Sequence, residues 1–391
     1  MQAIISIYSI KAMRVFVFGM VSIMTPVYLS ILGFSPFYVG LSLAAIVSGN
    51  ILSNILLTWF NRIVGTKTII LSFSFLMFVS GLIFFFANSL AAILVAAFIG
   101  NISVTGTEAG PFQSVETAII PNYIGEAKAG RAYGVYNVIG YASSSIGALA
   151  SSIPSYFNNS LESFRLLYLI YGIVGLTMLS IYSTFKLTNP QKQDAKGSPL
   201  PSLEKRVIRD ITKLSALFFT DAFGGGFVTQ SILSYWFYFV YHASLSSLGL
   251  IFLVANVITA ISTLVAPLIA EKIGNLRTMV YTHLISNIFL VSIPIAGSFA
   301  LAVSFLFMRQ SMSQMDVPTR QAFMIQVFNR EERVVANAVT NTSRSVANLF
   351  GAPTTGLLLS TGYASIPIII GGLVKIVYDI AVYSAYRRRV R

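Results

Sequence analysis

Long apolar stretches follow one another along almost the whole chain, and short polar stretches separate them. Most have about 20 residues, the length with which an α-helix crosses the hydrocarbon core of a bilayer. Lipid offers no partners to backbone polar groups, which favours helices, whereas a β-barrel would show shorter segments of alternating polarity. The pattern predicts twelve membrane-spanning helices, near residues 12–32, 37–59, 68–87, 89–118, 131–154, 164–185, 212–240, 246–270, 276–296, 298–326, 333–360 and 363–386.

One long polar segment interrupts this pattern between the sixth and seventh predicted spans. It runs from Lys186 to Lys213 and is rich in Pro, Ser and Lys, a composition typical of a linker. We therefore expect an N-terminal six-helix bundle over residues 1–185, a cytoplasmic linker over 186–211 and a C-terminal six-helix bundle over 212–391.

Basic residues are confined to alternate loops. Loops on the other side carry one acidic residue, Glu162, with Arg165 just beyond it. Cytoplasmic loops of membrane proteins collect Lys and Arg, so the sequence predicts a multi-pass protein of the cell (inner) membrane with both termini in the cytoplasm. This bias also accounts for the net charge of +13 without a nucleic-acid partner. The basic loop residues include Arg62, Lys67, Lys128, Arg131, Lys186, Lys205, Lys272, Arg277, Arg330, Arg333 and Arg387.

Composition excludes several other classes of protein. Only 10% of residues are charged, against about 25% in soluble domains, too few to cover a soluble surface. The chain has no cysteine and only two histidines, His242 and His283, so we expect no disulfide, no metal site and no cofactor. No phosphate-binding loop is present, so ATP does not drive the protein directly. The scarcity of His, Cys and paired acidic motifs argues against a membrane-embedded enzyme.

The two halves share residues at nearly constant spacing. A first group recurs at an offset of 209 residues, a second at 204, and Pro111 recurs as Pro318. These matches predict an internal duplication with both halves in the same orientation, a known plan for transporters. The first group pairs Ser35, Gly40, Leu41 and Gly65 with Ser244, Gly249, Leu250 and Gly274, and the second pairs Ala132, Val135, Asn137, Gly147 and Ala148 with Ala336, Val339, Asn341, Gly351 and Ala352.

On these features the chain resembles transporters of the major facilitator superfamily over essentially its whole length. The family signature after the second span has the form G-x3-D-R-x-G-R-R. The second half contains PLIAEKIGNLR, and the first half contains the weaker WFNRIVGTKT, in which Asn61 replaces the acidic residue. The resemblance implies an all-α fold of two pseudo-symmetric six-helix bundles, with a cytoplasmic gate at these motifs. The gate candidates are Arg62, Gly65, Lys67, Glu271, Lys272, Gly274 and Arg277.

Two further connections resemble the family. A basic residue opens the helix that follows each of them, Arg131 after the fourth span and Arg333 after the tenth. Glu116, near the expected cytoplasmic end of the fourth span, is a further gate candidate. The glycine-proline motif of the family's antiporters is only half present, because Ala148 follows Gly147 where proline would stand. The direction of transport therefore stays open.

Charged residues inside the spans are candidates for function, because a charge in the bilayer core is costly. Arg309, Asp316 and Arg320 in the tenth span fall within about 20° of one line on a continuous helix. The resemblance implies that this span lines a central pathway. Alternatively, Asp316 and Arg320 satisfy each other as an i,i+4 pair.

Two carboxylates are candidates for proton coupling beside Asp316. Asp221 precedes three glycines in the seventh span, and a buried carboxylate of this kind can bind a proton reversibly. The alternative for Asp221 is a salt bridge with an arginine of the tenth span. Glu108 lies among glycines that predict a locally broken helix. Arg14, at the expected inner end of the first span, is expected to extend toward the interface.

Other polar residues are weaker candidates. Asn341 and Arg344 belong to a polar stripe of helical spacing that includes Asn337 and Asn348. One interpretation is that this stripe lines the pathway. The alternative for its asparagines is that they form hydrogen bonds with neighbouring helices. Gln230 is a further pathway candidate. In the twelfth span, Lys375 and Asp379 are expected to pair with each other.

The preferred function is a secondary active transporter that moves a small solute by alternating access and is proton-coupled, with efflux of a drug or metabolite as one candidate direction. One alternative is an ion-coupled uptake carrier for an organic acid or sugar, and another is a non-transporting receptor or scaffold on the same fold. We expect a monomer in the lipid bilayer, with protons or another coupling ion. The intramembrane arginines favour an anionic or amphipathic solute unless nearby carboxylates cancel them. We expect the chemistry to lie mainly in the second half, with Glu108 as the main contribution from the first.

Overall fold

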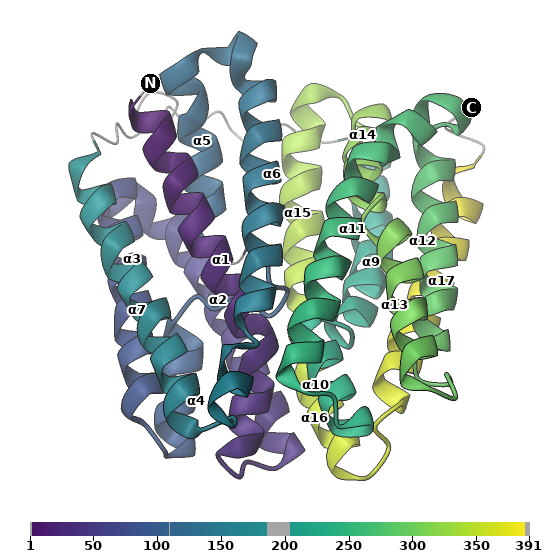
Figure 1. Ribbon diagram of the computed structural model, residues 1–391. Coiled ribbons are helices and arrows are strands. Elements are labelled where there is room, and N and C mark those ends of the chain that lie inside the picture. The colour runs from purple at the N-terminus through teal and green to yellow at the C-terminus, as the bar shows by residue number, and fades with distance from the viewer. Residues whose placement is uncertain (1, 109, 186–203, 388–391) are drawn as a thin grey trace. The chain divides into compact units, whose positions relative to one another are not determined.

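The computed structural model describes residues 2–108, 110–185 and 204–387, and within these ranges the regular structure is entirely helical (Figure 1). The first half contains α1 (Gln2–Ile31), α2 (Pro36–Val64), α3 (Thr66–Phe86), α4 (Leu90–Ile99), α5 (Phe112–Ile124), α6 (Glu126–Ala150), the short 3-10 helix η1 (Ile153–Phe157) and α7 (Leu161–Thr184). The second half contains α9 (Lys205–Gly226), α10 (Gln230–Tyr241), α11 (Leu245–Ile273), α12 (Asn275–Ser292), α13 (Phe299–Ser313), α14 (Asp316–Val327), α15 (Arg330–Asn348), α16 (Gly351–Ser360) and α17 (Ile366–Tyr386).

These helices correspond to the twelve predicted spans, and the all-helical membrane fold is confirmed. Eight spans are single helices, and four are broken in two: α4 with α5, α9 with α10, α13 with α14, and α15 with α16. Six of the described helices are long and apolar enough to cross a membrane by length and composition alone: α1, α2, α3, α7, α11 and α17. The other spans are divided into shorter pieces or carry more polar residues, so the length and composition of a single helix do not identify them as membrane spans.

The break in the fourth span was predicted and is confirmed. Helix α4 ends at Ile99, and the chain then takes positive φ at Asn101 (53°), Gly106 (74°) and Gly110 (67°) before α5 begins. Glycine adopts this left-handed region without the steric cost that a Cβ would impose. Glu108 therefore lies in a non-helical stretch inside the span.

The repeated signature glycines occupy equivalent turns. Gly65, between α2 and α3, has φ 83°, and Gly274, between α11 and α12, has φ 90°. Gly33 (φ 87°) and His242 (φ 51°) are likewise 209 residues apart and both left-handed. The duplication inferred from sequence is thus visible in backbone conformation. Since a side chain at Gly65 or Gly274 would be strained, both copies of the signature need glycine there.

Glycines also set the closest helix contacts, at equivalent places in the two halves. A Cβ at Gly147 of α6 would lie 1.9 Å from the Phe16 carbonyl oxygen of α1, so the two backbones touch. A Cβ at Gly351, 204 residues later, would lie 2.0 Å from the carbonyl carbon of Gly226 in α9. The first span of each half therefore packs directly on the fifth through small residues.

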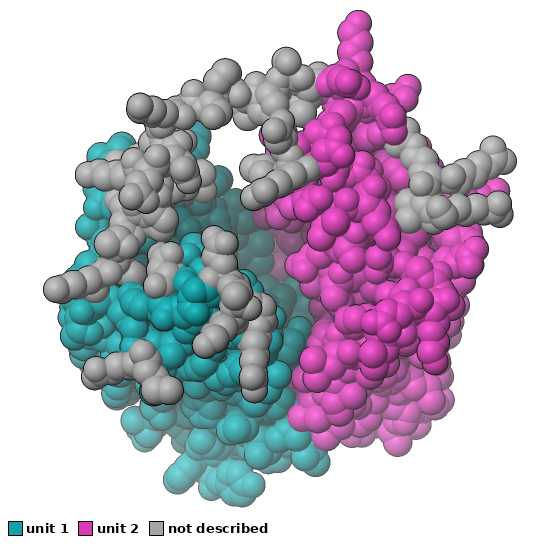
Figure 2. All heavy atoms as spheres, turned by 90° about the horizontal axis from the view of Figure 1, so that it is seen from above, with its two compact units in different colours: residues 1–197, 229–253 teal, residues 198–228, 254–391 magenta. Residues whose placement is uncertain are grey.

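The described residues form two compact units, coloured separately in Figure 2. The first unit holds the described residues of 1–197 together with 229–253, so α10 and the start of α11 belong to it. The second holds the described residues of 198–228 and 254–391. Helix α9 begins at Lys205, so residues 205–211, expected as linker, are helical instead. The reason is packing: Val207 and Ile211 join the buried apolar cluster around Phe218. Linker residues 186–203 lie outside the described part.

Candidate functional site

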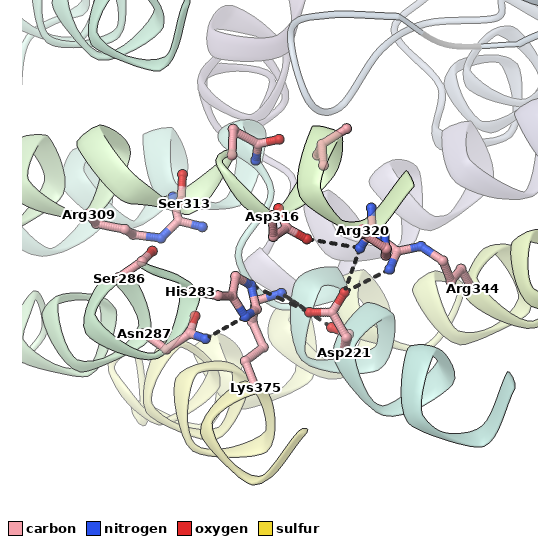
Figure 3. A pocket seen from close by; sticks show the side chains of 12 residues that line it. Asp221, His283, Ser286, Asn287, Arg309, Ser313, Asp316, Arg320, Arg344 and Lys375 are labelled. Atoms are coloured by element: carbon pink, nitrogen blue, oxygen red, sulfur yellow. Dashed lines mark hydrogen bonds and ion pairs between the residues drawn. The ribbon is translucent and has the colours of Figure 1, made fainter. Parts of the chain in front are cut away.

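Asp221 is the centre of a buried charge cluster in the second unit (Figure 3). It lies near the end of α9 and is only 2% exposed. Arg344 Nη1 on α15 lies 2.8 Å from Asp221 Oδ2, and Lys375 Nζ on α17 lies 2.5 Å from Oδ1. Arg320 Nη1 on α14 is 3.6 Å from Oδ2. The salt bridge considered for Asp221 is therefore present, with cations from three spans.

Asp316 and Arg320 form the i,i+4 pair that was the alternative to a pathway stripe. Arg320 Nη1 lies 2.9 Å from Asp316 Oδ2. The pair is not self-contained, because the same nitrogen faces Asp221. The tenth span is also not one continuous helix, since α13 ends at Ser313 and α14 begins at Asp316. The three residues of the predicted stripe nevertheless line one cavity.

His283 on α12 is a site residue that the sequence analysis missed. Its Nδ1 lies 2.7 Å from Asp379 Oδ1. Its Nε2 lies 3.6 Å from Asp221 Oδ1 (Figure 3). Asn287, one helical turn along, donates to Asp379 Oδ2 over 2.9 Å. A histidine and an asparagine four residues apart in an apolar span was the sequence signal that could have revealed them.

The predicted pair between Lys375 and Asp379 is wrong. Lys375 pairs with Asp221, and Asp379 accepts hydrogen bonds from His283 and Asn287. The i,i+4 spacing does place both side chains on one face of α17. That face packs against α9 and α12, which supply closer partners, and those partners could not be assigned from the sequence of one helix.

Arg309 on α13 is buried, with 8% of its surface exposed, and takes part in none of the ion pairs of the described residues. Its Nη1 donates to Gln310 Oε1 over 2.5 Å, and its Nε has no described hydrogen-bond partner. Figure 3 shows its guanidinium beside Ser313 and Ser286 at the edge of the cavity. A buried guanidinium with one neutral acceptor can still bind an anion.

Cations outnumber carboxylates around this cavity, which has a volume of about 90 Å³. Its carboxylates are Asp221 and Asp316, and its cations are Arg309, Arg320, Arg344 and Lys375. A second cavity, of about 340 Å³, shares two of these arginines, and its volume is within the range typical of small-molecule sites. That cavity is lined by Phe218, Arg320, Gln321, Met324, Ile325, Arg333, Asn337, Thr340, Asn341 and Arg344. Asn341 and Arg344 therefore line a cavity, and the gate candidate Arg333 does as well.

The first unit holds a second buried charge cluster, centred on Arg14. Arg14 has no exposed surface, and its Nη1 and Nη2 lie 2.5 and 2.7 Å from the two carboxylate oxygens of Glu116. Nη2 also lies 3.1 Å from Glu108 Oε1, and Lys11 pairs with the same carboxylate. Tyr136 donates to Glu116 Oε2 over 2.5 Å. Tyr182 donates to its other oxygen.

The expectation that Arg14 extends to the interface is wrong. Helix α1 begins at Gln2 rather than near residue 12, so Arg14 lies about 18 Å along the helix from its start. Glu116 likewise lies in the interior, with no exposed surface, rather than at the end of its span. The first half contributes the buried charges Lys11, Arg14 and Glu116 beside the half-buried Glu108, which was expected to be its main contribution. Sequence analysis missed Lys11, Tyr136 and Tyr182 here.

The remaining predicted residues lie apart from both clusters. Gln230, at the start of α10, donates from Nε2 to Ser22 Oγ of α1 over 2.9 Å. Lys67 Nζ donates to the Ser183 carbonyl over 2.6 Å, which ties α3 to the end of α7. Glu271, Lys272, Gly274 and Arg277 surround the turn between α11 and α12 and are exposed. The side chains of Arg62 and Arg131 lie outside the described part.

Comparison with known proteins identifies the class. The sequence pattern of the Major Facilitator Superfamily matches residues 7–352, and the chain belongs to this family of membrane transporters rather than to an enzyme class. An uncharacterized membrane protein of Saccharomyces cerevisiae, YJR124C, is 23% identical over 404 residues, covering 94% of this chain and 90% of the yeast protein.

Three solved structures share the fold. A D-xylose-proton symporter matches with TM-score 0.76 and 16% identity, covering 97% of each chain. The nucleoside transporter NupG matches with TM-score 0.72 and 12% identity, over 99% of this chain and 100% of its own. A bacterial homologue of the iron transporter ferroportin, in an inward-facing state, matches with TM-score 0.75 and 11% identity, over 98% of each chain. At these identities the likeness concerns the fold, which is that of secondary transporters.

Proposed function

We propose that the protein is a proton-coupled secondary transporter for a small organic anion, which binds at the Asp221 cluster. One observation carries the proposal: the cavity holds more cations than carboxylates, and among them Arg309 has no described ion-pair partner. A charge kept inside a membrane protein is costly unless a partner offsets it. An anion in this cavity would supply that partner.

The two cavities favour an organic solute over an inorganic ion. Arg320 and Arg344 line both of them, so an acidic group near these guanidiniums would leave the rest of the solute in the larger cavity. There Asn337 and Asn341 offer amides, and Phe218 offers an apolar face. Arginine suits such a site because its planar fork can bind a carboxylate through two hydrogen bonds.

The names of structural relatives are compatible with this proposal. One is a symporter of D-xylose and protons, and another transports nucleosides. D-xylose and nucleosides are small polar organic solutes. The proposal is compatible with uptake and with efflux. Efflux is supported by the half of the antiporter motif that is present at Gly147. We further propose the cytoplasmic placement of both termini in a cell membrane, which rests on the distribution of loop charges.

Ligand-induced thermal stabilisation of the purified protein tests the substrate class, because a ligand that binds only the folded state raises its stability. Benzoate and sulfate should stabilise the protein, whereas xylose, uridine and an amphipathic cation should not. Arg309→Gln should weaken benzoate binding about tenfold, since a hydrogen bond to a charged group contributes ~1.5–3 kcal/mol. Lys205→Gln, at the exposed start of α9, is the matched control and should bind normally.

Transport itself is tested in proteoliposomes. Labelled benzenesulfonate, an organic anion that stays ionised and does not cross lipid unaided, should accumulate when a pH gradient is imposed and should fail to do so in Arg309→Gln vesicles. Stabilisation by xylose or uridine without any response to the anions would overturn the anionic substrate class. Accumulation that ignores the pH gradient would overturn proton coupling.

A further inference from the structure

We propose that the substrate is an organic dianion with an acidic group at each end, and that Arg333 binds the second of these groups. This inference rests on the proposed function and deepens it by naming the substrate class and the residue that selects it. It depends on the distribution of charge along the larger cavity, which Arg320, Arg333 and Arg344 line together.

The charges around the two cavities are far from balanced. Among the residues that the structure describes, three arginines and no carboxylate line the larger cavity. The smaller cavity adds Arg309 and Lys375 as cations, and Asp221 and Asp316 as the carboxylates. A solute with one negative charge would leave two of these cations unbalanced, and a second acidic group would balance one more. Because an unbalanced charge inside a membrane protein is costly, the cavities favour a dianion.

The larger cavity has two basic ends. Arg333 and Arg344 are eleven residues apart on α15, which places them within about 20° of one face and about 16 Å apart along the helix. Arg320 belongs to the Arg344 end, because both side chains face the carboxylate of Asp221 (Figure 3). One end therefore has two arginines that share a carboxylate, and the other end has Arg333.

Arg333 has donors left for an anion. Its Nη2 donates to the Phe328 carbonyl oxygen over 3.3 Å, and its buried Nε has no described hydrogen-bond partner. Within the described ranges it takes part in no ion pair, and the carboxylate of the neighbouring Glu332 accepts from the Asn329 amide at the start of α15. A planar guanidinium held by one carbonyl can still bind a carboxylate or sulfonate through its remaining N–H groups.

The middle of the larger cavity suits an uncharged organic body. Met324 and Ile325 of α14, together with Phe218 of α9, offer apolar contacts. Asn337 and Asn341 lie on α15 between its two arginines, at successive helical turns, and their amides can bond to polar groups without adding charge. The cavity thus offers charge at its ends and neutral contacts between them.

The two ends should have different effects on affinity. The Arg320 and Arg344 end attracts an acidic group of any solute, whereas Arg333 adds affinity only when the solute is long enough to present a second one. Arg333 is therefore a specificity-determining residue for the proposed transport. Its contribution is visible as the difference in affinity between a dianion and the monoanion with the same body.

Titration calorimetry on the full-length protein measures this difference. Biphenyl-4-sulfonate and biphenyl-4,4′-disulfonate share one rigid body, differ by one terminal sulfonate and stay ionised at every working pH. The disulfonate should bind about tenfold more tightly, since a hydrogen bond to a charged group is among the stronger ones. Benzene-1,3-disulfonate has the same charge, but its sulfonates are too close together to reach both ends. It should show no such gain over benzenesulfonate.

Substitutions assign the gain to Arg333. Arg333→Gln should abolish the preference for the disulfonate and leave the affinity for biphenyl-4-sulfonate unchanged. Arg333→Lys keeps the charge and should retain part of the preference, and Arg333→Glu should reverse it by repelling the second sulfonate. Arg209→Gln removes an exposed arginine from α9 and is the matched control, which should bind both probes normally.

Melting temperatures of the ligand-free variants separate a lost contact from a folding defect. Arg333→Gln should melt with Arg209→Gln, because Arg333 makes one described hydrogen bond and no described ion pair. Should Arg333→Gln fail to fold, the two biphenyl probes on the unsubstituted protein and on Arg333→Lys decide instead.

The outcomes separate this inference from the proposed function. No binding of any of these sulfonates overturns the proposed function and the inference with it. Equal affinities for biphenyl-4-sulfonate and biphenyl-4,4′-disulfonate overturn the inference alone and leave a transporter of monoanions. A preference for the disulfonate that persists in Arg333→Gln likewise overturns the role of Arg333.

Discussion

Arg14 on α1 and Asp221 on α9 occupy corresponding positions in the two halves, 207 residues apart, and carry opposite charges. The same offset relates Gly19 to Gly226, which make equivalent close contacts with the fifth span of their own half. Carboxylates surround Arg14, and cations surround Asp221. The duplication therefore preserved the place of a buried charge while its sign and its partners diverged.

Replacing Asp221 should strongly destabilise the second unit. Asp221→Asn leaves Lys375 and Arg344 without the carboxylate that both contact, and removing one partner of a buried ion pair typically costs ~3–5 kcal/mol. Chemical unfolding in detergent should show this loss, and sulfate should restore part of it. Asp316→Asn is the control and should cost less, because Asp316 contacts a single arginine. Equal losses in the two variants would contradict the central role of Asp221.

The first-unit cluster should respond to substitution in a defined order. Arg14→Gln leaves two carboxylates short of their shared cation and should lower the free energy of unfolding by ~3–5 kcal/mol. Glu108→Gln should cost less, because its side chain is 13% exposed and Arg14 keeps Glu116. Thermal unfolding of both variants checks the order. A larger loss of unfolding free energy for Glu108→Gln would show that the ion pair between Glu108 and Lys11 stabilises this cluster more than the contacts of Arg14 do.

Glycine at position 147 should be required for packing. In Gly147→Ala the new methyl group would overlap the Phe16 backbone, so the helices must separate, at a cost of ~1–3 kcal/mol. Gly134→Ala, in the same helix α6 with nothing near its Cβ position, should be neutral or slightly stabilising. Melting temperatures check this prediction, because alanine favours the helix over glycine at both positions. A loss at Gly134→Ala as large as at Gly147→Ala would contradict the contact with α1 as the cause.

The contact of α10 with α1 should be open to cross-linking. Gln230 and Ser22 are joined by a side-chain hydrogen bond, while α9, the other half of the same span, belongs to the second unit. The chain has no native cysteine, so Ser22→Cys with Gln230→Cys can form only one disulfide. We expect oxidation to stop benzenesulfonate transport and reduction to restore it, because alternating access requires the broken span to move. Undiminished transport by fully cross-linked protein would show that this contact persists through the cycle.

The sequence by itself determined the span count, the duplication and the break beside Glu108. These features depend on local properties: the length of apolar runs, recurring glycines and the conformational freedom of Gly106 and Gly110. It also singled out Asp221, Arg320 and Arg344, since a charge in an apolar helix is conspicuous whatever its surroundings.

Only the tertiary structure decided which charges are partners. Spacing along α17 indicated that Lys375 and Asp379 pair with each other, yet the packing of three helices gives Lys375 to Asp221 and Asp379 to His283. Arg14 was misplaced because its depth depends on where α1 begins. An ion pair between spans depends on the relative rotation and depth of two helices, and those are set by side-chain packing between helices far apart in sequence.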